Sequence, residues 1–136
     1  MFGGMEADIL RISSSEDIVR VRQAVRGRAA AAGLNLIDQT KLVTAASEIA
    51  RNTLEYGGGG HVRIEMIVNG RKNGVRLTFE DTGPGIVDVE LALKDGYTTG
   101  GGLGLGLGGS KRLCNEFQID SKPGAGTRIV LARWTA

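Results

Sequence analysis

The chain has 136 residues, of which 41% are hydrophobic and 24% charged, a composition typical of an ordinary globular domain with one sizeable core. A formal net charge of +2 is too small to indicate a nucleic-acid partner. The single cysteine, Cys114, excludes an internal disulfide, and no apolar run reaches the roughly 18 residues of a membrane helix. We therefore predict a cytoplasmic protein with no nucleic-acid or membrane partner, folded as one domain over residues 1–136 with 1–5 disordered.

Glycine is frequent and unevenly placed. The chain has 22 glycines, about twice the usual share. Seven of them lie within 100–109 and four within 57–60, so they mark particular loops and do not indicate a low-complexity chain.

The first half of the chain predicts one strand followed by two helices. Residues 7–13 alternate apolar and polar side chains, as a half-buried strand does. Residues 16–32 carry apolar side chains at helical spacing, and Gly33 is placed to end that helix. A second helix is predicted to begin near 35–38 and to end at Gly57. Its buried side is expected to consist of Leu42, Ala46, Ile49 and Thr53.

The second half predicts two pairs of strands separated by helical segments. Residues 61–68 and 74–80 alternate strongly around a turn-rich stretch and favour an antiparallel hairpin. Residues 87–94 favour a short helix, and the glycine run leads into another through 107–115. The last strands are predicted at 117–121 and 127–134. This order predicts an α/β (α+β) two-layer sandwich, with a mixed but mainly antiparallel sheet and helices on one face.

Glu48 and Asn52 are four residues apart on the second predicted helix, so they point from one face. A carboxylate there can act as a general base towards an incoming hydroxyl, and an amide oxygen is a hard, neutral ligand suited to Mg²⁺. The same pair is also common on solvated helix faces, so this motif alone leaves both interpretations open.

Asp81, Gly83 and Gly85 directly follow a predicted apolar strand. A carboxylate at the strand's end can accept a hydrogen bond from the exocyclic amine of adenine, whereas guanine presents a carbonyl at that position. The two glycines allow the backbone to turn close to a ligand. An ordinary turn between a strand and a helix uses the same residue types, so that alternative stays open.

The run from Gly100 to Gly109 opens a predicted helix, where unpaired amide N–H groups and the positive end of the helix dipole favour an anion such as phosphate. A flexible loop is the alternative. Dinucleotide-binding and P-loop motifs are excluded, because no strand precedes the run and no Gly-Lys-Ser/Thr occurs. The candidate phosphate-binding residues are Gly102, Leu103, Gly104, Leu105, Gly106 and Leu107.

Four motifs therefore stand in a fixed order along the chain. They are Glu48 to Asn52, Asp81-x-Gly83-x-Gly85, Gly102-x-Gly104-x-Gly106 and Gly126-Thr127. Each is weak alone, but together they resemble the GHKL superfamily of ATPases and kinases, with its Bergerat ATP-binding fold. Over nearly its whole length the chain is most similar to the RsbT-type switch kinases, bacterial serine/threonine kinases related to the anti-sigma factor kinases.

The resemblance implies a chemical role for the helical pair and a ligand for the site. Glu48 would be the catalytic general base and Asn52 the ligand of Mg²⁺, with ATP as the bound nucleotide.

The resemblance also implies how the nucleotide is held. Asp81 would read adenine, Gly83 and Gly85 would form the turn beneath the base, and Thr127 would support Asp81 through a bridging water. The amides of the glycine run would hold the phosphates, and residues 97–101 would form a short lid.

The reaction that the resemblance implies is transfer of the ATP γ-phosphoryl group to a serine or threonine of a STAS-domain protein in a bacterial partner-switching pathway. That partner would be a stressosome scaffold or an anti-anti-sigma protein, and a PP2C-type phosphatase or a sigma factor is a further candidate partner. The alternative is a module that sequesters a sigma factor or phosphatase and uses ATP only as a conformational ligand. The basic residues of the first helix would then dock an acidic partner, although such runs are more often solvated. They are Arg20, Arg22, Arg26 and Arg28.

Overall fold

A computed structural model of the chain describes residues 7–86, 88–94 and 106–136. Within these ranges five strands form one sheet in the order β1-β2-β3-β5-β4. The strands are β1 (Asp8–Ile12), β2 (Gly60–Asn69), β3 (Lys72–Asp81), β4 (Glu116–Ser121) and β5 (Thr127–Trp134). The helices are α1 (Ser15–Ala31), α2 (Leu36–Glu55), α3 (Val89–Ala92) and α4 (Gly106–Arg112).

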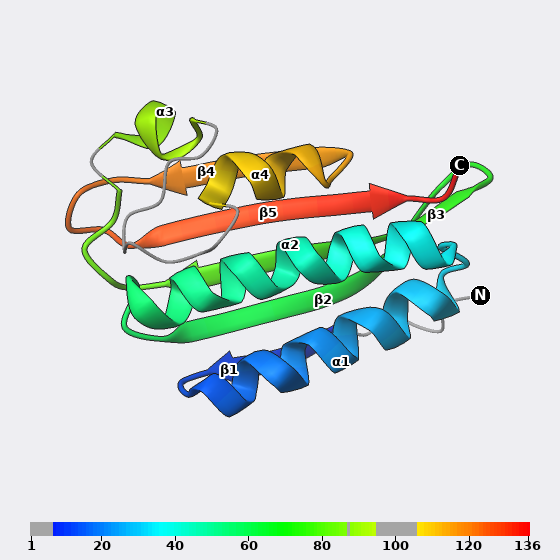
Figure 1. Cartoon of the computed structure of the whole chain (residues 1–136), viewed down its shortest axis with the longest axis horizontal. Helices are drawn as coiled ribbons and strands as arrows, with labels where there is room; N and C mark the ends of the chain where they lie inside the picture. Colours follow the sequence, from blue (N-terminus) through cyan, green and yellow to red (C-terminus); the bar gives the residue numbers. More distant parts are fainter. Residues whose placement is uncertain (1–6, 87, 95–105) are drawn as a thin grey trace.

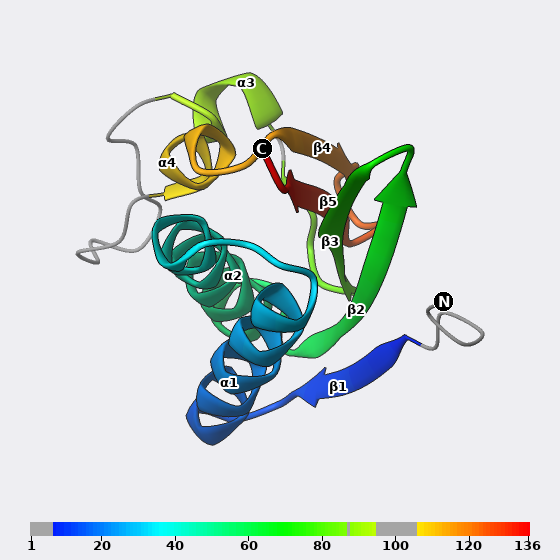
Figure 2. The ribbon, with the colours of Figure 1, turned by 90° about the vertical axis from the view of Figure 1, so that its right-hand side faces the viewer.

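The predicted two-layer sandwich is confirmed. Each neighbouring pair of strands in the described sheet is antiparallel. Helices α1 and α2 lie side by side on one face of the sheet, and α4 lies next to α2 (Figures 1 and 2). The opposite face carries no helix in the described ranges. Helix α2 therefore lies between α1 and α4 and packs on the central strands of the sheet.

Helix α1 begins where the side chain of Asp17 caps its first turn. The Asp17 carboxylate accepts the backbone N–H groups of Ser13 at 2.9 Å and Ser14 at 3.2 Å. The hydrogen bond from the Ser13 backbone is the largest cause lowering the pKa of Asp17 to about 2. Val21 and Val25 are buried on the helix's inner side, and the helix stops before Gly33, whose φ of 92° is left-handed.

Helix α2 is the central helix of the fold, and its predicted inner side is confirmed. The Asn35 side chain caps it by accepting the backbone N–H of Asp38 at 2.8 Å. The predicted inner residues Leu42, Ala46, Ile49 and Thr53 are all buried. The Thr53 hydroxyl donates to the Ile49 carbonyl at 2.9 Å, so this polar side chain is satisfied inside the helix.

The β2–β3 hairpin is longer than the alternation alone predicts. The two strands pair from Gly60 with Asp81 to Asn69 with Lys72. The turn is confined to two residues because Gly70 adopts a left-handed φ of 63° there. The extra length matters at the other end of the hairpin, because it carries Asp81 to the last ladder position of β3.

A partly buried ion pair links α2, β5 and the segment after α4. Arg133 of β5 donates to Asp38 of α2 at 2.7 Å and to the Leu113 carbonyl after α4 at 2.9 Å, and both charged side chains are only 14% exposed. Next to it, burial raises the pKa of the Cys114 thiol to about 12 against the opposing charge of Arg133. The thiol therefore stays protonated at neutral pH, as a core residue would.

Gly27 weakens α1 without serving its packing, because a Cβ at this position would meet no atom within 4 Å. We expect Gly27→Ala to stabilise the protein by about 0.5–1 kcal/mol, because alanine loses less backbone entropy in a helix. A rise in the urea midpoint with an unchanged m-value would show this. An unchanged or lower midpoint would contradict it.

Candidate functional site

The first part of the site is the face of α2 that carries Glu48 and Asn52. The Glu48 side chain is 14% exposed, and one of its oxygens lies 3.5 Å from Nη1 of the half-exposed Arg51. Asn52, one turn further on, is partly buried, and its side-chain amide makes no hydrogen bond within the described part of the chain. The carboxylate and the amide predicted to act together thus lie on one face, and the amide oxygen is available to a ligand.

The loop directly after α2 lies against Asp81. The carbonyl of Asn52 accepts the backbone N–H groups of Tyr56 at 2.9 Å and Gly57 at 3.2 Å, so these bonds close the end of α2. A Cβ added at Gly57 would lie 2.6 Å from Oδ2 of Asp81. Only a residue without a side chain fits here, so the helix end and the Asp81 carboxylate are in direct contact.

Asp81 ends β3 with one carboxylate oxygen held and the other available. Its Oδ1 accepts the backbone N–H of Gly83 at 2.9 Å. Its Oδ2 has no hydrogen bond among the described residues, although it faces Gly57. Gly83 packs against the backbone of Gly57 as well, since a Cβ on Gly83 would lie 2.7 Å from the Gly57 Cα. The predicted adenine-reading carboxylate is therefore fixed in direction.

The loop after Asp81 is fastened to the turn between β4 and β5. Gly85 has a left-handed φ of 78°, and its Cα lies against the carbonyl of Lys122. The Pro84 carbonyl accepts the N–H of Gly124 at 2.7 Å, and the N–H of Ile86 donates to the Ser121 hydroxyl at 2.8 Å. Gly85 thus occupies the tight turn predicted for it.

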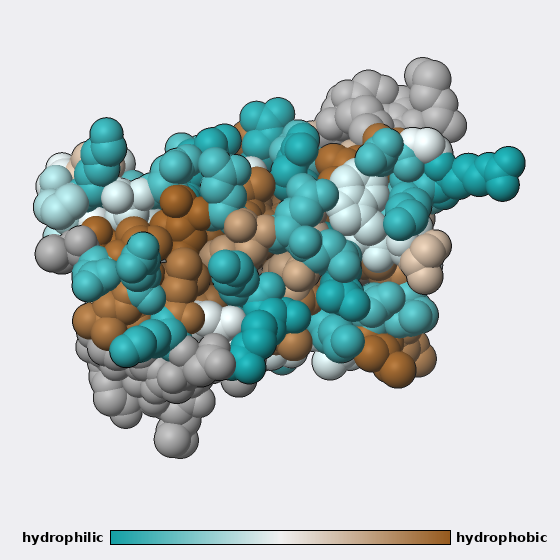
Figure 3. Space-filling model, turned by 90° about the horizontal axis from the view of Figure 1, so that it is seen from above, coloured by the Kyte–Doolittle hydropathy of each residue, from teal (hydrophilic) through white to brown (hydrophobic). Residues whose placement is uncertain are grey.

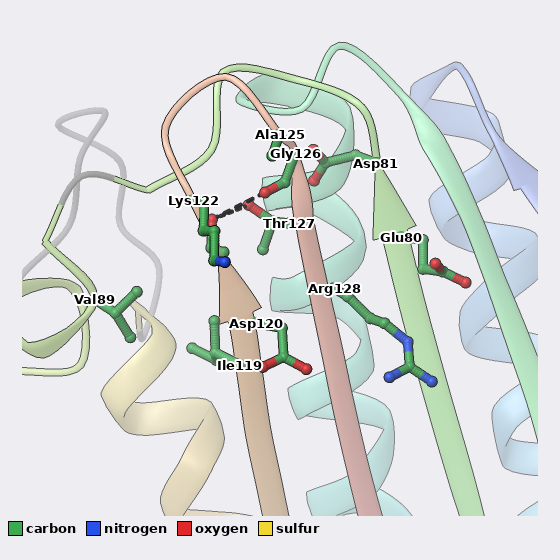
Figure 4. A pocket seen from close by; sticks show the side chains of 11 residues that line it. Glu80, Asp81, Val89, Ile119, Asp120, Lys122, Ala125, Gly126, Thr127 and Arg128 are labelled. Atoms are coloured by element: carbon green, nitrogen blue, oxygen red, sulfur yellow. Dashed lines mark hydrogen bonds between the residues drawn. The ribbon is translucent and has the colours of Figure 1, made fainter.

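Thr127 begins β5 directly opposite Asp81 in the ladder. Its hydroxyl oxygen lies 2.8 Å from that of Ser121, and the Ser121 hydroxyl also lies 3.1 Å from the Gly126 carbonyl. Both contacts are drawn as dashed lines in Figure 4, where Asp81 and Thr127 lie at the same end of adjacent strands. The two side chains that the sequence associates with adenine are thus cross-strand neighbours.

A cavity of about 450 Å³ opens at this end of the sheet, a size usual for small-molecule sites (Figure 4). It is lined by Glu80, Asp81, Val89, Ile119, Asp120, Ser121, Lys122, Ala125, Gly126, Thr127 and Arg128. Glu48 and Asn52 do not line it. In Figure 3, seen from the side of α4 and β4, apolar surface gathers towards the α3 end. The lining of the cavity itself combines apolar side chains, such as Val89 and Ile119, with polar and charged ones, such as Asp81.

Helix α4 contains the last residues of the glycine run, which pack against the core. Leu107 is 7% exposed in the core, so only its backbone can face a ligand. Gly108 lies directly against the Leu93 carbonyl, and the buried Ser110 hydroxyl donates to the Gly106 carbonyl at 3.1 Å. Of the predicted phosphate-binding set, Gly102, Leu103, Gly104 and Leu105 lie outside the described residues, as does the predicted lid.

Two residues of this site were not predicted from the sequence. Gly57 was interpreted as a helix terminator and Ser121 as the end of a strand. The run of four glycines after α2 could have indicated that Gly57 has a role besides ending the helix, because ending a helix needs only one glycine. Nothing in the sequence indicates Ser121, because its role depends on the β4–β5 turn meeting the loop after Asp81.

The family model for histidine kinase-, DNA gyrase B- and HSP90-like ATPases matches residues 37–135. The chain belongs to this family, whose members are ATPases, and the matched segment runs from α2 to the end of β5. ATP binding is therefore a property of the class.

Within that class the chain is a homologue of a serine/threonine protein kinase. It is 43% identical over 125 residues to the serine/threonine-protein kinase RsbT of Bacillus subtilis, covering 92% of this chain and 94% of the relative. It is 27% identical to an anti-sigma F factor of Clostridium kluyveri, covering 95% and 92% respectively. The resemblance predicted from the motifs is confirmed.

Solved structures show the same fold at low sequence identity. The RsbU and RsbW domains of Rv1364c from Mycobacterium tuberculosis match with a TM-score of 0.66 and 21% identity, over 94% of this chain and 32% of that one. The mycobacterial sensor histidine kinase MprB matches with a TM-score of 0.55 and 19% identity, over 94% and 97%. None of the described helices is long and apolar enough to cross a membrane.

Proposed function

We propose that this chain, as a single domain over residues 1–136, transfers the γ-phosphoryl group of Mg-ATP to a serine or threonine of a STAS-domain partner. The observation that carries the proposal is the contact between the end of α2 and Asp81. It places Asp81, a carboxylate suited to adenine, at the C-terminal end of the helix that carries Glu48 and Asn52. The similarity to RsbT over 92% of the chain supports a kinase rather than a bare ATPase.

The Glu48 carboxylate acts as the general base in this proposal. The oxygen of the acceptor hydroxyl attacks the γ-phosphorus, and the bond between the γ-phosphorus and the oxygen that leaves with ADP breaks. The proton of the hydroxyl passes to Glu48. Most of the rate enhancement comes from holding the hydroxyl and the phosphate in line. Arg51 lies 3.5 Å from the carboxylate and keeps it oriented along the helix edge before the acceptor arrives.

The donor set at the site fits a magnesium ion held mainly by the nucleotide. The described residues contain no group of three or more acidic, histidine or cysteine side chains that could form a protein cage for a metal. Mg²⁺ is commonly bound by one or two protein oxygens together with substrate phosphates, and the Asn52 side-chain amide supplies such an oxygen. A bound ion would neutralise charge on the phosphates during transfer.

Asn52→Ala should make nucleotide binding less sensitive to magnesium. With the amide oxygen gone, we expect the gain in ATP affinity on adding Mg²⁺ to fall by about tenfold, while affinity in EDTA stays unchanged. Calorimetric titrations with and without Mg²⁺ measure both. An unchanged magnesium effect would remove Asn52 from the ligand role.

A second candidate function is a binding module that sequesters a sigma factor and uses ATP as a conformational ligand. The similarity to anti-sigma F factors at 26–30% identity favours considering it. In α1, Arg20 pairs with Asp17, and Arg28 pairs with Asp8, so much of the basic charge predicted to dock a partner is already neutralised. Size-exclusion chromatography with a sigma factor, run beside a phosphorylation assay on STAS proteins, separates the two. A stable complex without phosphorylation would favour this second function.

A further inference from the structure

Ser121 lies where three segments of the site meet. Its partly buried hydroxyl contacts the loop after Asp81 through the N–H of Ile86, the β4–β5 turn through the Gly126 carbonyl, and β5 through the Thr127 hydroxyl. These distances are 2.8, 3.1 and 2.8 Å. No other described side chain of the site makes as many contacts between separate segments of the chain.

Hydrogen-bond accounting fixes the direction of each of these contacts. A serine hydroxyl has one proton to donate and two lone pairs to accept with. The Ile86 N–H can only donate, so it takes one lone pair, and the Gly126 carbonyl can only accept, so it takes the proton. The remaining lone pair then accepts the proton of Thr127. In the reverse arrangement the Gly126 carbonyl loses its hydrogen bond from Ser121.

Thr127 then faces the cavity as an acceptor, because its own proton is committed to Ser121. Oδ2 of Asp81, its cross-strand neighbour, is also an acceptor without a hydrogen bond among the described residues. Two adjacent acceptors suit a group with two N–H donors, such as the exocyclic amine of adenine, either directly or through one water. They oppose the carbonyl that hypoxanthine and guanine carry at that position.

We propose that Ser121 is a specificity-determining residue that holds the Thr127 hydroxyl as an acceptor and so selects adenine over 6-oxopurines. This inference rests on the proposed nucleotide site. Ser121 does not touch the base itself and acts through Thr127, so it is a positioning residue. Removing its hydroxyl frees Thr127 to rotate and donate to a carbonyl.

The test is the ratio of affinities for ADP and inosine diphosphate, measured by calorimetry with Mg²⁺. We expect Ser121→Ala to lower this ratio by about tenfold, through weaker ADP binding and unchanged or stronger inosine diphosphate binding. A purely structural loss would weaken both nucleotides alike and leave the ratio unchanged, which would overturn the proposal.

A matched control removes the same kind of bond at the other end of the sheet. The Thr135 hydroxyl accepts the backbone N–H of Asn73 at 3.1 Å, as Ser121 accepts that of Ile86, so Thr135→Val should leave the ratio unchanged. Thr127→Val should lower the ratio as Ser121→Ala does, and the double variant should lower it no further. Additive losses in the double variant would contradict an action through Thr127.

If Ser121→Ala does not fold, Thr127→Val decides alone, and an unchanged ratio in that variant overturns the proposal. A wild-type protein that binds neither nucleotide would overturn the proposed function itself. If the wild-type protein binds both nucleotides and the variants show the same affinity ratio as the wild type, only the role of Ser121 is overturned.

Discussion

Glu48→Gln is expected to slow phosphoryl transfer to a STAS-domain acceptor by about a thousandfold while leaving ATP affinity within about threefold of wild type. Glutamine has the shape of glutamate and can still accept a hydrogen bond, but it cannot take up the acceptor's proton. Because the two side chains have nearly the same size, this mostly buried position accepts the change without repacking. Single-turnover transfer of labelled γ-phosphate, with calorimetry for binding, measures the two effects separately.

Glu55→Gln is the matched control, because Glu55 ends the same helix on an exposed position outside the site. This variant should transfer phosphate at the wild-type rate. Transfer retained in Glu48→Gln would remove Glu48 from the role of base. A wild-type protein that transfers nothing to any STAS protein would instead count against the kinase proposal as a whole.

The fold followed from hydrophobic patterning because its elements are long and strongly periodic. The inner side of α2, with Leu42 and Ile49, was predictable from helical spacing, and the β2–β3 hairpin from alternation. The ends of the helices and strands were harder to predict from the sequence. The helix predicted through 107–115 ends at Arg112, because the next residues bond to β5 instead. The Leu113 carbonyl accepts a hydrogen bond from Arg133, and the Asn115 N–H donates to the Ala132 carbonyl.

The sequence predicted only those parts of the site that depend on residue type and on spacing along the chain. Glu48 and Asn52 lie four apart on one helix, and Asp81 ends an apolar strand, so local reasoning placed them correctly on their elements. The contacts that position Asp81 and the loop after it are long-range. Ser121 and Ile86 are 35 residues apart, and the fit of Gly57 against Asp81 depends on how α2 crosses the sheet. The spacing of apolar residues along the sequence does not predict such contacts.

Gly57→Ala should reduce ADP affinity by about tenfold to a hundredfold, although the variant adds one methyl group and removes no polar atom. The new Cβ would lie 2.6 Å from both Cβ and Oδ2 of Asp81, so the carboxylate has to leave its position. A displaced Asp81 loses its hydrogen bond to the base, and bonds involving a charged group contribute about 1.5–3 kcal/mol. Isothermal calorimetry with ADP and Mg²⁺ measures the loss.

The neighbouring glycine separates this effect from backbone strain. Gly58 has a left-handed φ of 73°, but a Cβ there would meet no atom within 4 Å. Gly58→Ala should therefore lower the free energy of unfolding by about 1 kcal/mol while leaving ADP affinity nearly unchanged. If both variants lose affinity equally, the glycine run acts through loop conformation. If Gly57→Ala binds ADP as tightly as wild type, the Asp81 carboxylate does not need the position against α2 to read adenine.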